Sequence, residues 1–199
     1  MKVELHIKNV FDRIASVLII GVLVPLFIVV ALFIKFESNG GVFFRQKRCG
    51  LNCEAFYMYK FRTMVDNAEA LKYHLTSEVE GSVFKVKYDP RITRIGRFLR
   101  KWSIDELPQL INVLKGEMSL VGPRPLEEKE MAGDLEWKKL RLTVKQGMTG
   151  LWQIKGRASC KFDDWIFYDT YYVNNWSLWL DFKILLMTIP AVLRKKGAY

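Results

Sequence analysis

The stretch IASVLIIGVLVPLFIVVALFI, residues 14–34, decides the fold class because its 21 positions contain no charged residue. Flanked by Arg13 and Lys35, a run of this length can cross the apolar core of a bilayer. A signal peptide would have a shorter apolar region followed by small residues at a cleavage site, which residues 33–37 do not offer. We therefore expect residues 1–36 to form a retained membrane helix.

Pro25 lies within this run. A proline in a helix interior removes a backbone hydrogen bond and costs about 3 kcal/mol. The surrounding Leu, Ile, Val and Phe side chains favour insertion by about 5 kcal/mol or more in sum. Insertion therefore outweighs the proline, and we expect a helix that bends at Pro25.

Apolar length alone favours a single membrane span, but the basic residues on both flanks favour a different topology. The positive-inside rule draws both flanks to the cytoplasm, and a proline-broken, re-entrant helix satisfies this rule. The basic residues are Lys2, Lys8 and Arg13 before the run and Lys35, Arg45, Lys47 and Arg48 after it.

The composition indicates one catalytic domain, residues 37–199, whose partners are anionic. The 199 residues carry a formal net charge of +10, which attracts phospholipid headgroups, nucleic acid or a phosphorylated substrate. Cys49, Cys53 and Cys160 form neither an even-numbered disulfide framework nor a zinc-site pattern, so we expect reduced thiols.

Secondary structure is predicted most clearly at four places. Residues 42–48 and 55–61 read as strands around a turn at Gly50-Leu51-Asn52, residues 65–75 read as a helix, and Asp89-Pro90 marks a turn. Near the C-terminus, a stripe at helical spacing fits either an amphipathic helix at a lipid interface or a helix packed on the core. The stripe is Trp176, Trp179, Phe182, Leu185, Leu186 and Ile189, followed by Arg194, Lys195 and Lys196.

A row of cations leads into the acidic pair Asp105-Glu106. Arg91, Arg94, Arg97 and Arg100 recur every three residues, with Lys101 beside them. Such a row is often only a solvated helix face, but arginine forks also match phosphate oxygens and could hold a diphosphate near a reactive group.

The acidic pair itself has a structural and a functional interpretation. Ser103 and Glu106 form the S-x-x-E pattern of a capping box, and Pro108 could instead open a helix that starts slightly later. Either way Asp105 lies within about a turn of a helix start that attracts anions. We expect that helix to run over residues 109–114 and to stop at Gly116.

The sequence resembles the bacterial sugar transferase family, the monotopic phosphoglycosyl transferases, over almost its whole length. The matching residues are 60–64 (KFRTM), 89–91 (DPR), 100–120, 122–125 (GPRP), 147–153 (GMTGLWQ), 156–157 (GR), 171–173 (YYV), 175–177 (NWS) and Asp181.

This resemblance implies an α/β domain that a proline-broken re-entrant helix and interfacial amphipathic helices seat on the cytoplasmic face of the bacterial inner membrane. It implies that the catalytic Asp105 attacks a UDP-sugar, releases UMP and passes hexose 1-phosphate to undecaprenyl phosphate, while Glu106 helps to hold Mg²⁺. It assigns substrate binding to a further set of side chains, which are Lys60, Arg62, Arg100, Arg124, Gln153 and Arg157.

Two departures from the family pattern concern the N-terminus. Many members have Lys-Arg where this chain has Lys8-Asn9, ahead of Phe11-Asp12, and many carry a preceding multi-span region that this sequence does not contain. The sequence of residues 151–157 and 175–181 most resembles that of galactose or glucose phosphate transferases. An N-acetylhexosamine is the alternative for the sugar that is transferred. The sequence leaves a homo-oligomer open.

Two non-catalytic interpretations compete with this one. A basic, membrane-tethered module could bind nucleic acid or anionic lipid, but the arginine row is not regularly interleaved with aromatic stacking platforms, since Phe98 is the one aromatic residue within it, so we expect no nucleic-acid partner. A scaffold could retain the fold without activity, although Arg100, Asp105, Glu106 and Arg124 are all present.

Overall fold

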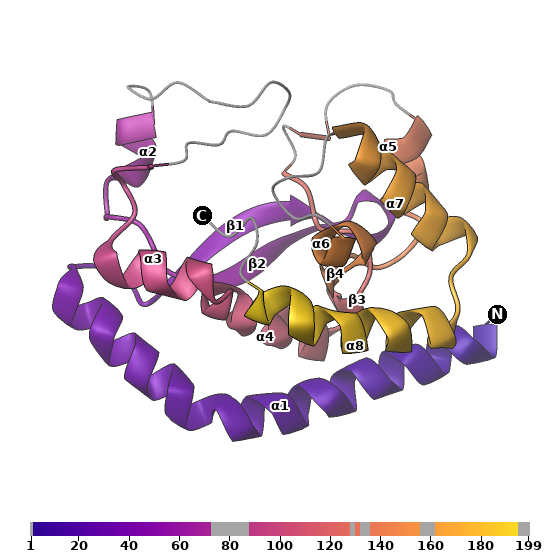
Figure 1. The fold of residues 1–199 in the computed structure, drawn as a ribbon, viewed down its shortest axis with the longest axis horizontal. Coiled ribbons are helices and arrows are strands. Elements are labelled where there is room, and N and C mark those ends of the chain that lie inside the picture. The colour runs from indigo at the N-terminus through magenta and orange to yellow at the C-terminus, as the bar shows by residue number, and fades with distance from the viewer. Residues whose placement is uncertain (1, 73–87, 128–129, 132–135, 156–161, 195–199) are drawn as a thin grey trace.

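The computed structural model describes residues 2–72, 88–127, 130–131, 136–155 and 162–194 (Figure 1). The chain begins with a long helix, α1 (Lys2–Glu37), and continues through a mixture of short helices and strands. The elements of its first half are β1 (Phe43–Cys49), the 3-10 turn η1 (Leu51–Cys53), β2 (Ala55–Phe61), α2 (Ala68–Lys72), α3 (Arg94–Lys101), the 3-10 helix η2 (Ile104–Gln109) and α4 (Leu110–Lys115). The remaining elements are β3 (Ser119–Val121), α5 (Glu136–Arg141), β4 (Gly147–Thr149), α6 (Leu151–Lys155), α7 (Phe162–Asn174) and α8 (Leu178–Leu193).

Helix α1 is bent and runs along one side of the domain as its lower boundary in Figure 1. The expected bend of this helix is present. Helical geometry continues through Pro25, so the helix is not broken there. One limb of the bent helix lies below α3 and the other below α8.

The outer face of α1 is apolar and is not covered by any of the described residues. Among the described residues α1 is the one helix long and apolar enough to cross a membrane, and only 11% of its most apolar window is buried. Val22 and Phe36 are 79% and 85% exposed. Leaving so much apolar surface in water is unfavourable, which indicates that another apolar phase covers this face.

Polar contacts hold both ends of α1 on the same domain. Near the N-terminus, Lys8 Nζ lies 2.5 Å from Asp181 Oδ2 of α8 and donates to the carbonyl oxygen of Val121 at 3.2 Å. At the other end, the carboxylate of Glu37 accepts the backbone N–H groups of Arg94 and Ile95 at the start of α3.

Two small sheets confirm the predicted mixture of helix and strand. Strands β1 and β2 pair antiparallel from Phe43↔Phe61 to Cys49↔Ala55, around the predicted turn. Strands β3 and β4 are parallel, with Ser119 opposite Gly147 and Val121 opposite Thr149.

Two apolar clusters hold these elements together. The larger joins β2, α4 and β3 to α7 and α8 through residues such as Met58, Val113 and Ile184. The smaller joins the second limb of α1 to β2 and α3 through Val30, Ile34, Phe61 and Leu99. The domain core is therefore continuous with the inner face of the apolar helix.

The helix predicted before the arginine row has a different boundary in the structure. The helix expected over residues 65–75 begins only at Ala68, because Met64 pairs with Ile92 and the Val65 N–H donates to the Arg91 carbonyl, which keeps this backbone extended. Residues 73–75 lie outside the described residues. The turn at Asp89-Pro90 is confirmed by the bond from the Ile92 N–H to the Asp89 carbonyl.

Helix α8 packs on the domain core through part of the C-terminal stripe, whereas its location at a lipid interface stays a prediction. Leu185 and Trp176 pack against the larger cluster around the fully buried Ile184. Trp179, Phe182, Leu186 and Ile189 of the same stripe are exposed. Arg194 follows the helix, whereas Lys195 and Lys196 lie outside the described residues.

Candidate active site

The acidic pair lies on η2, and this 3-10 helix begins directly after Ser103, a residue in the left-handed conformation. Ser103 has φ 56° and its side chain caps no helix, so the predicted capping box is wrong. Glu106 instead directs its carboxylate to side chains from other elements. The structural interpretation of the acidic pair therefore fails. Pro108 lies inside η2, and α4 begins only at Leu110, so Pro108 does not occupy the first turn of α4 either.

Helix α4 fixes the position of this segment relative to β2. The fully buried Asn112 accepts the N–H of Tyr59 at 3.0 Å and donates to the carbonyl of Tyr57 at 2.7 Å. The helix ends at Gly116, as predicted, with φ 82°. Asn112 was missed from the sequence, although a polar residue inside an otherwise apolar helix is a signal for such a contact.

Glu106 joins Lys60 of β2 to Arg124, which follows β3. Its Oε1 atom accepts from Lys60 Nζ and from Arg124 Nη2, both at 2.8 Å. The Glu106 side chain is 24% exposed, so solutes can reach this cluster from solvent. The Lys60, Glu106 and Arg124 assignments thus fall on one contiguous group.

Arg100 approaches the same group from α3. Its Nε atom donates to Thr63 Oγ1 at 2.9 Å, a partner missed from the sequence although it lies in the matching stretch 60–64. Gly96 allows α3 to pack this closely, because a Cβ there would lie 2.1 Å from the Thr63 carbonyl oxygen. Thr93 caps the helix by accepting the Gly96 N–H, which places the start of α3 at Arg94.

The expected arginine row is wrong for its first member. Arg91 precedes the helix and is buried against Asp89, with Nη2 at 2.6 Å from Oδ2. Arg94 and Arg97 are exposed, so Arg100 is the member of the row that turns toward the acidic pair.

Asp105 is buried among these charges. Asp105 is only 8% exposed, and this burial raises the pKa of its carboxyl group. The positive charge of Lys60 lowers that pKa, whereas the negative charge of Glu106 raises it further. Burial also raises the pKa of Glu106, but Arg124 and Lys60 outweigh it, so that pKa lies well below its usual range. Asp105 is thus the more basic carboxylate of the two, and hence the better nucleophile once ionised.

The pKa values of the cations are shifted by the same burial and ion pairing. Burial lowers the pKa of Lys60 and of Arg100, whereas Glu106 raises the pKa of Arg124. A cluster with three cations around two carboxylates retains a positive excess, which suits an incoming phosphate.

Three of the predicted site residues are not placed in this cluster. The guanidinium of Arg62 donates to the carbonyls of Ser38 and Asn39, so it holds the loop after α1. Gln153 on α6 donates weakly to Met148, and its buried Oε1 has no partner in the described part of the chain. Arg157 lies outside the described residues.

Arg124 and Gln153 nevertheless follow neighbouring strands. Arg124 comes just after β3 and Gln153 just after β4, and the carboxyl ends of parallel strands meet at one edge of a sheet. Gly147 makes the close packing there possible, because a Cβ on it would lie 2.0 Å from the Gly122 nitrogen.

Residues 3–195 match the model of the family described as bacterial sugar transferase. The chain belongs to the bacterial sugar transferase family.

Curated relatives within this family carry informative names. The chain is 44% identical over 200 residues to the undecaprenyl-phosphate galactose phosphotransferase of Salmonella typhimurium, covering 97% of this chain and 42% of the relative. It is 42% identical to the undecaprenyl-phosphate glucose phosphotransferase of Komagataeibacter xylinus, covering 96% and 37%. It is 40% identical to the exopolysaccharide production protein ExoY of Sinorhizobium fredii, covering 96% and 88%.

The chain thus spans less than half the length of the two named phosphotransferases but nearly all of the ExoY protein. The family match includes α1 and α8 together with the cluster around Glu106.

The residues around Glu106 meet the requirements of a hydrated magnesium ion that is shared with a phosphate ligand. No group of three His, Cys, Asp or Glu side chains that could hold a metal occurs among the described residues. Magnesium, however, commonly takes only one or two carboxylates together with waters and substrate phosphates. Glu106 fits this requirement, because the hydrogen bonds that its carboxylate accepts from Lys60 and Arg124 both use Oε1, which leaves Oε2 for a metal ligand as far as the described residues show.

Proposed function

We propose that the chain transfers hexose 1-phosphate from a UDP-sugar to undecaprenyl phosphate and releases UMP, through a covalent phosphosugar–aspartate intermediate. The observation that carries the proposal is the buried Asp105, adjacent to the Lys60–Glu106–Arg124 group and near Arg100. The names of the relatives support the same sugar-phosphate chemistry and the same lipid carrier.

In the first half-reaction, a carboxylate oxygen of Asp105 attacks the β-phosphorus of the donor. The bond from that phosphorus to the bridging oxygen breaks, and UMP leaves with the electron pair. Lys60, Arg100 and Arg124 offset the repulsion between the carboxylate and the anionic diphosphate, and the fixed positions of these cations stabilise the charge that develops on the leaving phosphate.

In the second half-reaction, a phosphate oxygen of undecaprenyl phosphate attacks the phosphorus of the acyl phosphate. The bond to Asp105 breaks, the carboxylate is regenerated, and a lipid-linked diphosphate sugar forms. An acyl phosphate is reactive enough for this displacement, so the soluble donor and the lipid acceptor need not occupy the site together.

Magnesium is part of the proposal, with Glu106 as the protein ligand. The ion would supply further charge neutralisation on the donor diphosphate. The sugar is galactose or glucose, as in the names of the relatives, with an N-acetylhexosamine as the alternative. The product would serve exopolysaccharide, O-antigen or glycoprotein glycan synthesis.

The membrane arrangement follows from α1 and α8. Lys8 and Glu37 tie the two ends of α1 to one domain, so both ends lie on the same side of any membrane that the bend enters. The exposed apolar residues of α8 would lie at the lipid interface, where tryptophan is favoured. We place the domain on the cytoplasmic face of the bacterial inner membrane.

A donor panel tests the proposal and the role of the metal. Purified protein, undecaprenyl phosphate, Mg²⁺ and each of several UDP-sugars should release UMP with one preferred sugar, and a chelator should abolish this release until Mg²⁺ is restored. Glu106→Gln should lower the rate about 100-fold and raise the Mg²⁺ concentration needed for half-maximal activity, because the ion loses a charged ligand.

Glu54→Gln is the matched control, since Glu54 is an exposed glutamate on the turn before β2. It should behave like the parent protein in both measurements. Full activity in chelator, or an unchanged Mg²⁺ requirement in Glu106→Gln, would remove the metal from the mechanism.

Membrane topology can be tested by cysteine labelling. In a background without the native cysteines, Glu4→Cys and Lys47→Cys should react with an impermeant reagent in inverted vesicles and not in right-side-out ones. Val22→Cys, on the exposed face of the bend, should stay unlabelled in both, and all three should react in detergent. Labelling of Glu4→Cys and Lys47→Cys from opposite sides would establish a single span instead.

A further inference from the structure

An apolar groove of about 310 Å³ lies between α1 and α3. Its lining is entirely apolar and includes Val29 and Phe33 of α1, Phe98 and Leu99 of α3, and Ile104 of η2. Leu99 is buried and forms part of the floor, whereas Val29, Phe33 and Phe98 are about half exposed and form the rim. The groove therefore opens on the same outer surface as the uncovered face of α1.

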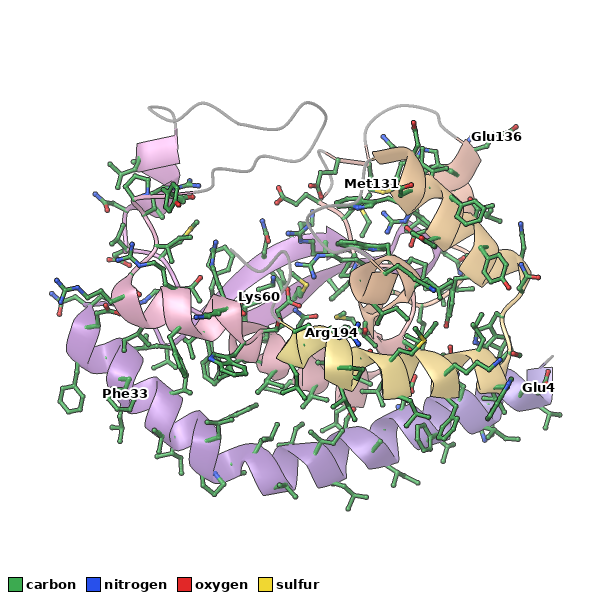
Figure 2. The ribbon with its side chains drawn as sticks, viewed as in Figure 1. Glu4, Phe33, Lys60, Met131, Glu136 and Arg194 are labelled. Carbon is green, nitrogen blue, oxygen red and sulfur yellow. The ribbon has the colours of Figure 1, made fainter. Side chains whose placement is uncertain are left out.

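The groove is directly connected to the candidate active site through the chain. Leu99 of the groove directly precedes Arg100, and Ile104 of the groove directly precedes Asp105. Phe61 packs in the same apolar cluster as Leu99 and Ile104 and directly follows Lys60. Three elements thus present apolar residues toward α1 and charged residues toward the acidic pair. In Figure 2, Phe33 lies below α3 on one limb of α1, and Lys60 lies above α3.

We propose that this groove binds the first isoprene units of the polyprenyl phosphate acceptor and positions its phosphate at Asp105. The inference rests on the proposed function and adds a binding site for the acceptor chain. An acceptor with an anionic head and an apolar tail matches a site with cations on one side and an apolar groove on the other. The volume is at the lower end of the ~300–1,000 Å³ of small-molecule sites, which suits the first units of the chain.

A phospholipid acyl chain is the alternative occupant. Such a chain would use the groove for membrane attachment alone, and membrane attachment does not require the groove to lie beside a reactive carboxylate. If the acceptor occupies the groove, blocking the groove impairs the second half-reaction. If a phospholipid acyl chain occupies it, blocking the groove weakens membrane binding instead.

The test separates the two half-reactions. Val29→Trp fills the groove from α1, and Phe98→Gln makes its rim polar from α3. With donor alone, both variants should release UMP and form the adduct like the parent protein. When the isolated adduct is mixed with undecaprenyl phosphate, both should need at least about tenfold more acceptor for half-maximal discharge.

Chain length provides a second readout. The parent protein should discharge to farnesyl phosphate, whose first isoprene units can occupy the groove, more efficiently than to dimethylallyl phosphate, which has a single isoprene unit, and the variants should lose much of this preference. Phe36→Gln is the matched control, because Phe36 lies on the same limb of α1 but does not line the groove. It should match the parent protein in every measurement.

Several outcomes would overturn the inference. Discharge by both variants at the parent's acceptor concentration would show that the groove does not bind the acceptor. Equal losses in UMP release and in discharge would show a structural role only, and reduced vesicle flotation with unchanged discharge would identify an acyl chain as the occupant. A parent protein that forms no adduct would instead refute the proposed function itself, which distinguishes the two failures.

Discussion

Asp105→Asn should abolish formation of the covalent intermediate and lower turnover at least about 1,000-fold. Asparagine has nearly the size of aspartate but lacks the anionic oxygen that attacks phosphorus, so the first half-reaction has no nucleophile. Given donor alone, the parent protein should release at most one UMP per active site and gain the mass of one hexose phosphate. Acceptor should then discharge the adduct, with ping-pong kinetics.

The same substitution should not impair folding. Because burial raises the pKa of Asp105, the charged carboxylate is less favourable in the folded protein than in the unfolded chain, and stability is lost as pH rises through that raised pKa. Asparagine removes this cost, so Asp105→Asn should melt at neutral pH no lower than the parent protein. A loss of activity with unchanged or higher melting temperature is a pattern typical of a functional residue.

Asp66→Asn is a suitable control, since Asp66 is an exposed aspartate before α2. It should retain both adduct formation and turnover. A well-folded Asp105→Asn protein that turns over near the parent rate would eliminate the covalent mechanism, whichever sugar is used.

Local sequence patterns were sufficient where local physics decides the structure. The uncharged run with Pro25 predicts a long bent helix, the turn residues around Gly50 predict the hairpin, and Gly116 predicts the end of α4. In each case the deciding property, hydrophobic length or backbone conformation, belongs to residues adjacent in the chain.

Patterns were insufficient where a distant partner competes with a local one. Three-residue spacing placed Arg91 in a helical row, but the carboxylate of Asp89 binds it before the helix starts. The Thr93 cap was a readable signal for that start. The capping box failed because Glu106 has two cationic partners on other elements, and spacing along the chain does not show them.

The assignment of site residues shows the same division. The matching stretches of the family bring Lys60, Arg100, Glu106 and Arg124 into one cluster around Asp105, whereas the catalytic and binding roles that the resemblance implies for them stay predictions. Arg62, in the same stretch as Lys60, contacts the loop after α1, because it lies beyond the end of β2 at Phe61, where the alternation of the strand no longer fixes the direction of its side chain. Motif membership thus locates a site without assigning every side chain in it.

The anchoring of α1 is the part of the fold least visible in the sequence, because its partners are 173 positions apart. Lys8 and Asp12, four residues apart before the apolar run, are both buried, and Lys8 Nζ contacts Asp181 on α8. Asp181 also accepts from Tyr172 Oη at 2.7 Å and from Trp176 Nε1 at 3.1 Å. One carboxylate thus joins α1 to α7 and α8.

Removing this charge should be strongly destabilising. Asp181→Asn keeps an oxygen acceptor for Tyr172 but leaves Asp12, at 3.7 Å, as the one carboxylate beside the buried Lys8 ammonium among the described residues. Breaking a buried ion pair from one side costs about 3–5 kcal/mol, which for a chain of this size lowers the melting temperature by about 10 °C. Thermal unfolding in detergent should show this loss, whereas Asp163→Asn, at an exposed position on α7, should shift the melting temperature by less than about 2 °C.

Neutralising both partners distinguishes a charge effect from a packing effect. Lys8→Met combined with Asp181→Asn leaves no unpaired ammonium, so the double variant should be more stable than the sum of the two single losses predicts, with a coupling of up to about 3 kcal/mol. Strict additivity would mean that Lys8 and Asp181 do not interact in the folded protein. The first limb of α1 would then be held by apolar packing, and no ion pair between Lys8 and Asp181 would keep the N-terminal end of the helix on the same side of the membrane as the domain.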